Sequence, residues 1–221
     1  MERKKGFTLS ETLITLAVLG IIIAATIPTL INTTNKHNYV NGLKKAYLIL
    51  KTATSQLMAD NSGTMINMVA TNDAGTLLNK YCSKLNCVQV CASLTPGCFS
   101  NSTAAKNLYG DNFWFDATNS SNIASAILSN GMLLSVTADD FSGTASLVGS
   151  VWVDVNGFKP PNTAGRDIFG FLLTTNSIVP YGTIKDTTYN NLNTYCSPSS
   201  NDTQSGKSCS GRILTEGAMN Y

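Results

Sequence analysis

The chain has 221 residues, of which 43% are hydrophobic and only 13% charged, whereas soluble domains usually carry about 25% charge. Fifteen basic residues stand against thirteen acidic ones, giving a formal net charge of +2. This balance provides no strong field for binding nucleic acid, so we expect no specific nucleic-acid partner. The single histidine, His37, excludes any mechanism that needs two histidines.

An apolar run from residue 7 to residue 27 contains one charge, Glu11. A helix of this length measures about 31 Å, which matches a bilayer hydrocarbon core of about 30 Å. Basic residues at positions 3–5 precede the run, so the N-terminus should stay cytoplasmic and the rest of the chain should lie outside. Residues 22–27 lack the small-residue site of a secretory signal peptide, so the run should remain in the mature protein.

Glu11 needs an explanation, because a carboxylate inside a membrane helix costs at least about 2.5 kcal/mol and is usually kept for a function. Residues 4–11, Lys-Lys-Gly-Phe-Thr-Leu-Ser-Glu, resemble the cleavage and methylation site of type IV prepilins and of the related pseudopilins of type II secretion. The resemblance implies that a prepilin peptidase cuts after Gly6 and that Phe7 becomes an N-methylated first residue. Glu11 is then the fifth mature residue, the position of the family's characteristic glutamate, and Pro28 the twenty-second, where pilins commonly carry a helix-loosening proline.

The resemblance also implies a role for Glu11 and a set of partners. Glu11 would neutralise the new α-amino group of Phe7 on a neighbouring subunit, which fixes filament register through one buried ion pair. The implied partners are other pilins in a homo- or hetero-polymer, the prepilin peptidase, an assembly platform with its ATPase, and the membrane. The implied location is the bacterial inner membrane with the head in the periplasm, followed by a pilus or pseudopilus that can reach the cell surface.

The implied function is that of a structural subunit of a type IV pilus or a type II secretion pseudopilus, polymerised through its N-terminal helix. Adhesion, motility, DNA uptake and secretion are the activities of such filaments, and the sequence does not choose among them. The alternative is a monomeric membrane-anchored adhesin or binding module, which would use the same helix only as an anchor.

Beyond Pro28 the apolar pattern becomes one-faced and continues through about Ala59. Spacings of three and four residues predict one long helix whose second half lays a single stripe on a globular head. Pro28 and Gly42 should bend or locally melt it. The stripe comprises Tyr39, Leu43, Ala46, Tyr47, Leu50, Ala53 and Leu57.

The chain should therefore divide into three parts. Residues 1–6 would be a leader peptide, residues 7–60 the transmembrane, assembly and amphipathic helix, and residues 61–221 a globular head. Within the head, residues 185–221 are rich in Asn, Ser, Thr and Gly with little periodicity. We expect loops there, stapled by a disulfide rather than packed.

Strand patterns separated by Gly and Asn or Asp clusters predict an antiparallel sheet in the head. Residues 74–81 favour a short helix, and residues 122–128 a helical turn or short helix. The fold class is thus α+β, with the long N-terminal helix packed on the sheet. The predicted strands are Asn112–Asp116, Met132–Thr137, Leu147–Val155, Ile168–Thr174 and Ile178–Thr183.

Six cysteines allow fifteen pairings, and an oxidising compartment favours disulfides. We expect Cys196 to pair with Cys209, a pair that is also similar to the disulfide-bounded region of type IV pilins. Two further bridges should form within the upstream four. A zinc or redox site is the alternative, but the spacing C-x4-C-x3-C-x6-C contains no C-x2-C element. The upstream four are Cys82, Cys87, Cys91 and Cys98.

A calcium site is the one cofactor hypothesis. Asp154, Asn156 and Asp167 offer oxygen ligands near a glycine turn, and pseudopilin heads can bind calcium. The terminal glutamate of an EF-hand loop is missing, which favours a plain Asn-Gly turn that ends a strand. We find no nucleophile elbow, zinc-protease, P-loop or dinucleotide motif, and we predict that the chain is not an enzyme.

Overall fold

The structure is a computed structural model that describes residues 6, 8–91, 98, 99, 105–113 and 122–221. Two compact units divide the chain, residues 1–38 and residues 39–221. Helix α1, Leu9–Asp60, contributes to both. The helix is uninterrupted through Pro28 and Gly42, so the expected local melting is not found.

In the first unit, every described residue of α1 through Asn38 is exposed in the single chain. Most of these side chains are apolar, and no residue of the best membrane-length window is buried. By length and composition α1 could cross a membrane. An apolar helix without a buried face needs an apolar surrounding, either lipid or other helices.

In the head unit, α1 buries one stripe at three- and four-residue spacing, as predicted. Tyr47 stacks on Phe171 of the sheet with ring centroids 5.7 Å apart. A Cβ atom at Gly42 would lie 2.9 Å from the Cβ of Val155, so glycine permits close approach of the helix to the sheet. The buried residues of α1 are Val40, Leu43, Ala46, Leu50, Ala53, Thr54 and Leu57.

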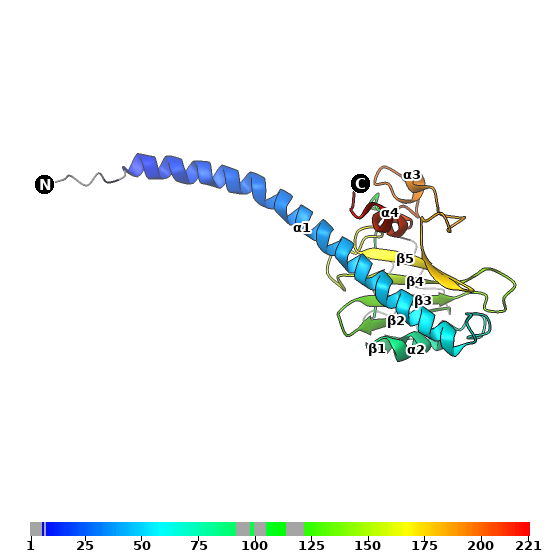
Figure 1. The fold of residues 1–221 in the computed structure, drawn as a ribbon. Helices are drawn as coiled ribbons and strands as arrows, with labels where there is room; N and C mark the ends of the chain where they lie inside the picture. Colours follow the sequence, from blue (N-terminus) through cyan, green and yellow to red (C-terminus); the bar gives the residue numbers. More distant parts are fainter. Residues whose placement is uncertain (1–5, 7, 92–97, 100–104, 114–121) are drawn as a thin grey trace. The chain divides into compact units, whose positions relative to one another are not determined.

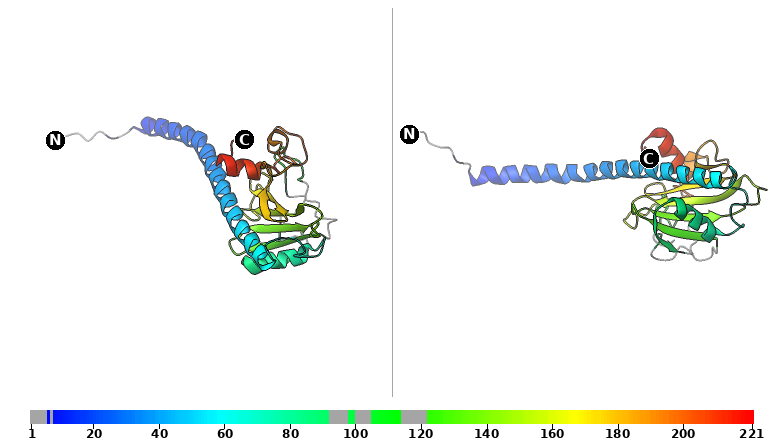
Figure 2. Two further views of the ribbon diagram at one scale, coloured as in Figure 1. Left: turned by 45° about the vertical axis from the view of Figure 1, so that its right-hand side comes forward. Right: turned by 60° about the horizontal axis from the view of Figure 1, so that its bottom comes forward.

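Six strands in the described part of the head form one sheet in the order β1-β2-β3-β4-β5-β6 (Figures 1 and 2). All neighbouring strands are antiparallel, and tight turns join β2 to β3 and β5 to β6. The predicted α+β class with an antiparallel sheet is confirmed. The strands are β1 Cys87–Cys91, β2 Ile123–Leu128, β3 Leu133–Ala138, β4 Leu147–Asp154, β5 Ile168–Thr174 and β6 Ser177–Pro180.

Both faces of the sheet are covered. One cluster joins the sheet to α1, to α2, Ala74–Lys84, and to α4, Cys209–Glu216. The second lies on the other face and contains Trp152 and Phe113, whose rings meet edge to face at 5.4 Å. The central strands are therefore buried on both sides.

Several sequence predictions differ from the structure. Residues 123–128 form strand β2, not a helical turn, because their backbone pairs with β1 and β3. Strand β1 is not among the predicted strands. The last predicted strand ends at Pro180, two residues before Gly182, whose φ of 81° turns the chain. Of the strand predicted at residues 112–116, Asn112 forms an isolated bridge with Lys106, and residues 114–116 lie outside the described residues.

The C-terminal segment is also more ordered than predicted. It contains α3, Leu192–Tyr195, and α4, Cys209–Glu216. The first residues of α4 are buried, and Ile213 is fully buried in the core. The predicted disulfide is present in this segment, but the expectation that residues 185–221 are not packed is wrong.

Candidate functional site

The N-terminus of α1 is built as a capping box. The Thr8 carbonyl accepts the first helical bond, from the Thr12 N–H at 3.2 Å. The Glu11 carboxylate accepts from the Thr8 N–H at 2.8 Å and from its hydroxyl at 2.9 Å, while the Thr8 hydroxyl accepts from the Glu11 N–H at 3.3 Å. These bonds satisfy N–H groups that the helix leaves without partners. Glu11 therefore has a local role in this chain before any neighbour is considered.

Along α1 beyond Glu11, the described surface offers no nearby charge that could neutralise this carboxylate. Between Glu11 and Lys36 the sequence of α1 carries no ionisable side chain. Threonine hydroxyls on this stretch donate back to carbonyls of their own helix, as Thr26 does to Ile22 at 2.9 Å, so they add little free polarity. The exposed large apolar side chains are Leu9, Leu13, Ile14, Leu16, Val18, Leu19, Ile21, Ile22, Ile23, Ile27, Leu30 and Ile31.

The residues predicted for processing and assembly fall in this region. Gly6 is exposed, and Phe7 lies outside the described residues. Pro28 is inside α1, where it removes one backbone donor while the helix continues.

Three disulfide bonds fix the head. Cys82 pairs with Cys87 and Cys91 with Cys98, so both bridges of the upstream set meet the ends of β1. Cys196 pairs with Cys209 and links α3 to α4. Cys196 pairs with Cys209 and the upstream four cysteines form two bridges, as predicted. No cysteine is left as a free thiol, so the alternative of a zinc or redox site has no thiolate ligands.

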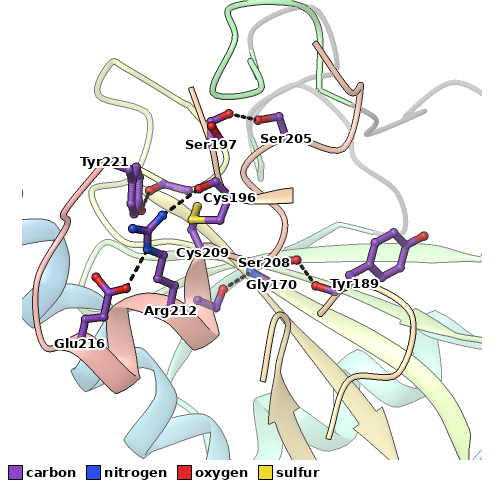
Figure 3. Close-up of a disulfide and its surroundings, with 12 residues drawn as sticks. Gly170, Tyr189, Cys196, Ser197, Ser205, Ser208, Cys209, Arg212, Glu216 and Tyr221 are labelled. Atoms are coloured by element: carbon purple, nitrogen blue, oxygen red, sulfur yellow. Dashed lines mark hydrogen bonds and ion pairs between the residues drawn. A yellow bond between two sulfur atoms is a disulfide. The ribbon is translucent and has the colours of Figure 1, made fainter. Parts of the chain in front are cut away.

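Hydrogen bonds surround the Cys196–Cys209 bridge (Figure 3). Arg212 donates to the Cys196 carbonyl at 3.2 Å and forms an ion pair with Glu216 at 2.9 Å. The Ser208 hydroxyl donates to the carbonyl of Tyr189. These bonds stabilise a segment that offers few apolar side chains.

Lys207 is buried in this segment at 4% exposure. Its ammonium lies 3.7 Å from the ring centroid of Tyr189 and 5.0 Å from that of Tyr181, and it donates to Gln204 at 3.2 Å. Burial lowers the pKa of the Lys207 ammonium to about 8, and the Asp186 carboxylate opposes part of this shift. The aromatic rings stabilise the remaining charge by cation–π interaction.

The residues of the calcium hypothesis bind their own loop. Both oxygens of Asp167 accept backbone N–H groups, from Asn162 at 2.8 Å and Thr163 at 2.6 Å. Asp154 accepts from the N–H of Asn156 at 3.2 Å. Burial raises the pKa of Asp167, and the two N–H donors oppose this.

Asn156 leaves its Oδ1 buried without a described partner. One such oxygen is far from the six to eight ligands that calcium takes. No group of three or more His, Cys, Asp or Glu residues able to hold a metal occurs among the described residues. The calcium hypothesis stays a prediction that this geometry does not strengthen.

Two features were not predicted from the sequence. No local sequence pattern indicates that Lys207 is buried, because its aromatic partners lie 18 and 26 residues away in the sequence. The capping box does have a sequence pattern, the Thr-x-x-Glu of residues 8–11.

Comparison with known proteins matches one end of the chain. Residues 1–27 match the family model described as the prokaryotic N-terminal methylation motif. No curated protein and no solved structure matches the chain. The motif therefore supports a function for the N-terminal region, and the head is interpreted from its structure alone.

Proposed function

We propose that this chain, which carries the N-terminal signature of type IV pilins and pseudopilins, is a structural subunit of a type IV pilus or of a type II secretion pseudopilus. The peptidase would cut after Gly6, and Phe7 would be methylated. Residues 7–60 would anchor the subunit in the inner membrane and then polymerise it, with residues 61–221 as the periplasmic head. Other pilins, an assembly platform and its ATPase would be the partners.

One observation carries the proposal: a carboxylate lies at the start of a helix whose surface from Thr12 to Ile31 is exposed, uncharged and mostly apolar. The capping box satisfies hydrogen bonds but leaves the negative charge uncompensated. In an apolar surrounding that charge is costly without a cation. A new α-amino group on a neighbouring subunit supplies the cation.

Two substitutions of Glu11 separate the charge from the cap. Glu11→Gln keeps a side chain that can complete a capping box but removes the charge, whereas Glu11→Ala removes both. We expect both variants to insert in the membrane and both to be lost from filaments, as measured by immunoblotting of sheared filament fractions against membrane fractions.

Normal incorporation of Glu11→Gln would contradict the ion pair and leave only the capping role. Absence of the unsubstituted chain and of both variants from the filament fraction, with normal membrane insertion of all three, would favour the monomeric anchored module. N-terminal sequencing of assembled material is the second measurement. A chain that begins at methylated Phe7 supports the proposal, and one that begins at Met1 overturns it.

A further inference from the structure

A groove of about 700 Å³ lies in the head between α1, β6 and α4. Its floor is β6 with the loop from Gly182 to Lys185, and Tyr47 and Lys51 line the α1 side. Gly211, Arg212 and residues 214–216 of α4 line the opposite side. The volume falls within the range of ordinary ligand sites.

The floor of the groove is the open edge of the sheet. Strand β6 is the last strand in the sheet order, paired on one side with β5. Thr174 faces Ser177 across a two-residue turn, and the Tyr181 N–H bonds to the Gly170 carbonyl. Because hydrogen-bonded pairs alternate along an antiparallel ladder, the N–H and C=O of Ile178 point away from β5.

These outward groups of Ile178 need a partner. Among the residues that the structure describes, none forms a hydrogen bond with them. Ile178 is only 5% exposed, and a backbone group with little access to water costs free energy when it stays unpaired. The next outward position is Pro180, which has no N–H, and its carbonyl already accepts from Thr183 at 3.0 Å. One residue of β6 thus offers a donor and an acceptor side by side.

The side chains of the groove are apolar and basic. Leu192 and Leu214 line it together with Ile178. Lys51 and Lys185 have no ion-pair partner within the described ranges, while Arg212 is paired with Glu216, the lining's one acidic residue. An occupant should therefore combine backbone hydrogen bonds, apolar side chains and a negative charge.

We propose that the groove binds an extended peptide segment of another protein, which adds as a strand to β6 and places a carboxylate near Lys51 and Lys185. A paired strand satisfies the donor and acceptor of Ile178 together, which an acyl chain cannot do. The groove uses α1 only through residues of the head unit, Tyr47 and Lys51, and its test does not measure filament assembly, so either proposal can fail alone.

The test uses the full chain in lipid nanodiscs and a fluorescein-labelled pool of hexapeptides built from valine, isoleucine and threonine with a free C-terminal carboxylate. We expect saturable binding by fluorescence anisotropy below about 1 mM. Methylation of the peptide backbone nitrogens should weaken binding about tenfold, because strand pairing is lost. Amidation of the carboxylate should weaken it about threefold.

Variants of the chain give the matched comparison. Ile178→Pro removes the outward N–H and also part of the buried side chain, whereas Ile178→Val shortens the side chain but keeps the N–H. The proline variant should therefore bind about tenfold more weakly than the valine variant. Lys51→Ala should weaken binding about threefold, whereas Lys44→Ala, an exposed change on α1 outside the groove, should not.

The outcomes decide the proposal. No binding by the pool overturns it, and so does binding that is insensitive to backbone methylation and to Lys51→Ala. A further measurement labels the nanodisc lipid instead of the peptide. If the head binds the labelled lipid and the peptide displaces it, the groove is a lipid site and the proposal is overturned. If Ile178→Pro unfolds the head, the methylated peptides and Lys51→Ala still decide.

Discussion

Residues 9–38 of α1 are mainly apolar and exposed in the single chain, whereas residues 205–211, which include Cys209 of the Cys196–Cys209 bridge, are mainly polar and buried. Ser205, Ser208 and Ser210 are fully buried there. The first region must acquire its surroundings from outside, because no described part of the chain buries it. The second is stabilised by hydrogen bonds, a cation–π contact and a cross-link rather than by apolar area. Apolar composition therefore identifies the first region but not the second.

The sharpest test of the second region is Gly206→Ala. Gly206 has a φ of 105°, and a Cβ atom there would lie 2.2 Å from the carbonyl oxygen of Ala164. Strain and overpacking should together cost about 4 kcal/mol of unfolding free energy. Urea unfolding followed by tryptophan fluorescence measures this cost.

Gly63→Ala is the matched control for that change. Gly63 also has a positive φ, 85°, but nothing lies within 4 Å of its Cβ position. We expect a cost of about 1 kcal/mol from the backbone strain alone. Equal costs for the two variants would mean that the segment around Gly206 is loosely packed, which contradicts its description as a buried polar region.

The cross-links give the second test. Replacing Cys196 and Cys209 together by serine opens a loop with a sequence separation of 13 and should cost about 3 kcal/mol in the chain-entropy model. The same change at Cys82 and Cys87 opens a separation of 5 and should cost about 2 kcal/mol. Urea unfolding of both double variants would show whether the C-terminal bridge is the larger contribution; the reverse order would contradict this account.

The difference between the two regions also explains what the sequence could predict. A long apolar run with three- and four-residue spacing after it indicates α1 directly, and alternating apolar residues indicate β4 and β5. The sequence of strand β2, Ile-Ala-Ser-Ala-Ile-Leu, predicts a helical turn because alanine favours helices. Its pairing with β1 and β3 overrides that preference.

Helix α4 was missed for the opposite reason. It begins Cys-Ser-Gly, which are poor helix formers, and its N-cap Ser208 makes no side-chain cap. Gly211 is present because a Cβ atom there would lie 2.7 Å from the Tyr181 carbonyl oxygen. Contacts between residues distant in sequence, and not local propensity, specify this helix, the Lys207 environment and the groove beside β6.

The pH dependence of stability tests the buried cation. The folded state releases the Lys207 proton near pH 8, whereas the unfolded chain keeps it to an ordinary pKa of 10.5. The unfolded state therefore binds more protons in this window, so the free energy of unfolding should rise with pH, by about 2 kcal/mol between pH 8 and 10. Burial raises the pKa of Tyr181, so its later ionisation should reverse the trend above about pH 10. Urea unfolding at several pH values measures the curve.

Lys207→Met is the control for the pH profile. Methionine keeps much of the side-chain volume over the Tyr189 ring but cannot titrate. The rise between pH 8 and 10 should disappear in this variant. If the rise persists without the ammonium, another group causes it and Lys207 is not buried as a cation.

The smallest effect compares single hydroxyls in the two regions. Ser208→Ala removes a fully buried hydroxyl that donates to the carbonyl of the half-buried Tyr189 and should cost about 1.5 kcal/mol of unfolding free energy. Thr26→Val removes a hydroxyl that donates to a carbonyl of its own exposed helix at 2.9 Å and should change stability by less than about 0.5 kcal/mol. Its membrane-inserted fraction should stay the same or increase, because an apolar side chain replaces a polar one. If Ser208→Ala costs no more than Thr26→Val, the buried polar groups near the C-terminus do not stabilise the head, and the disulfide alone holds that segment in place.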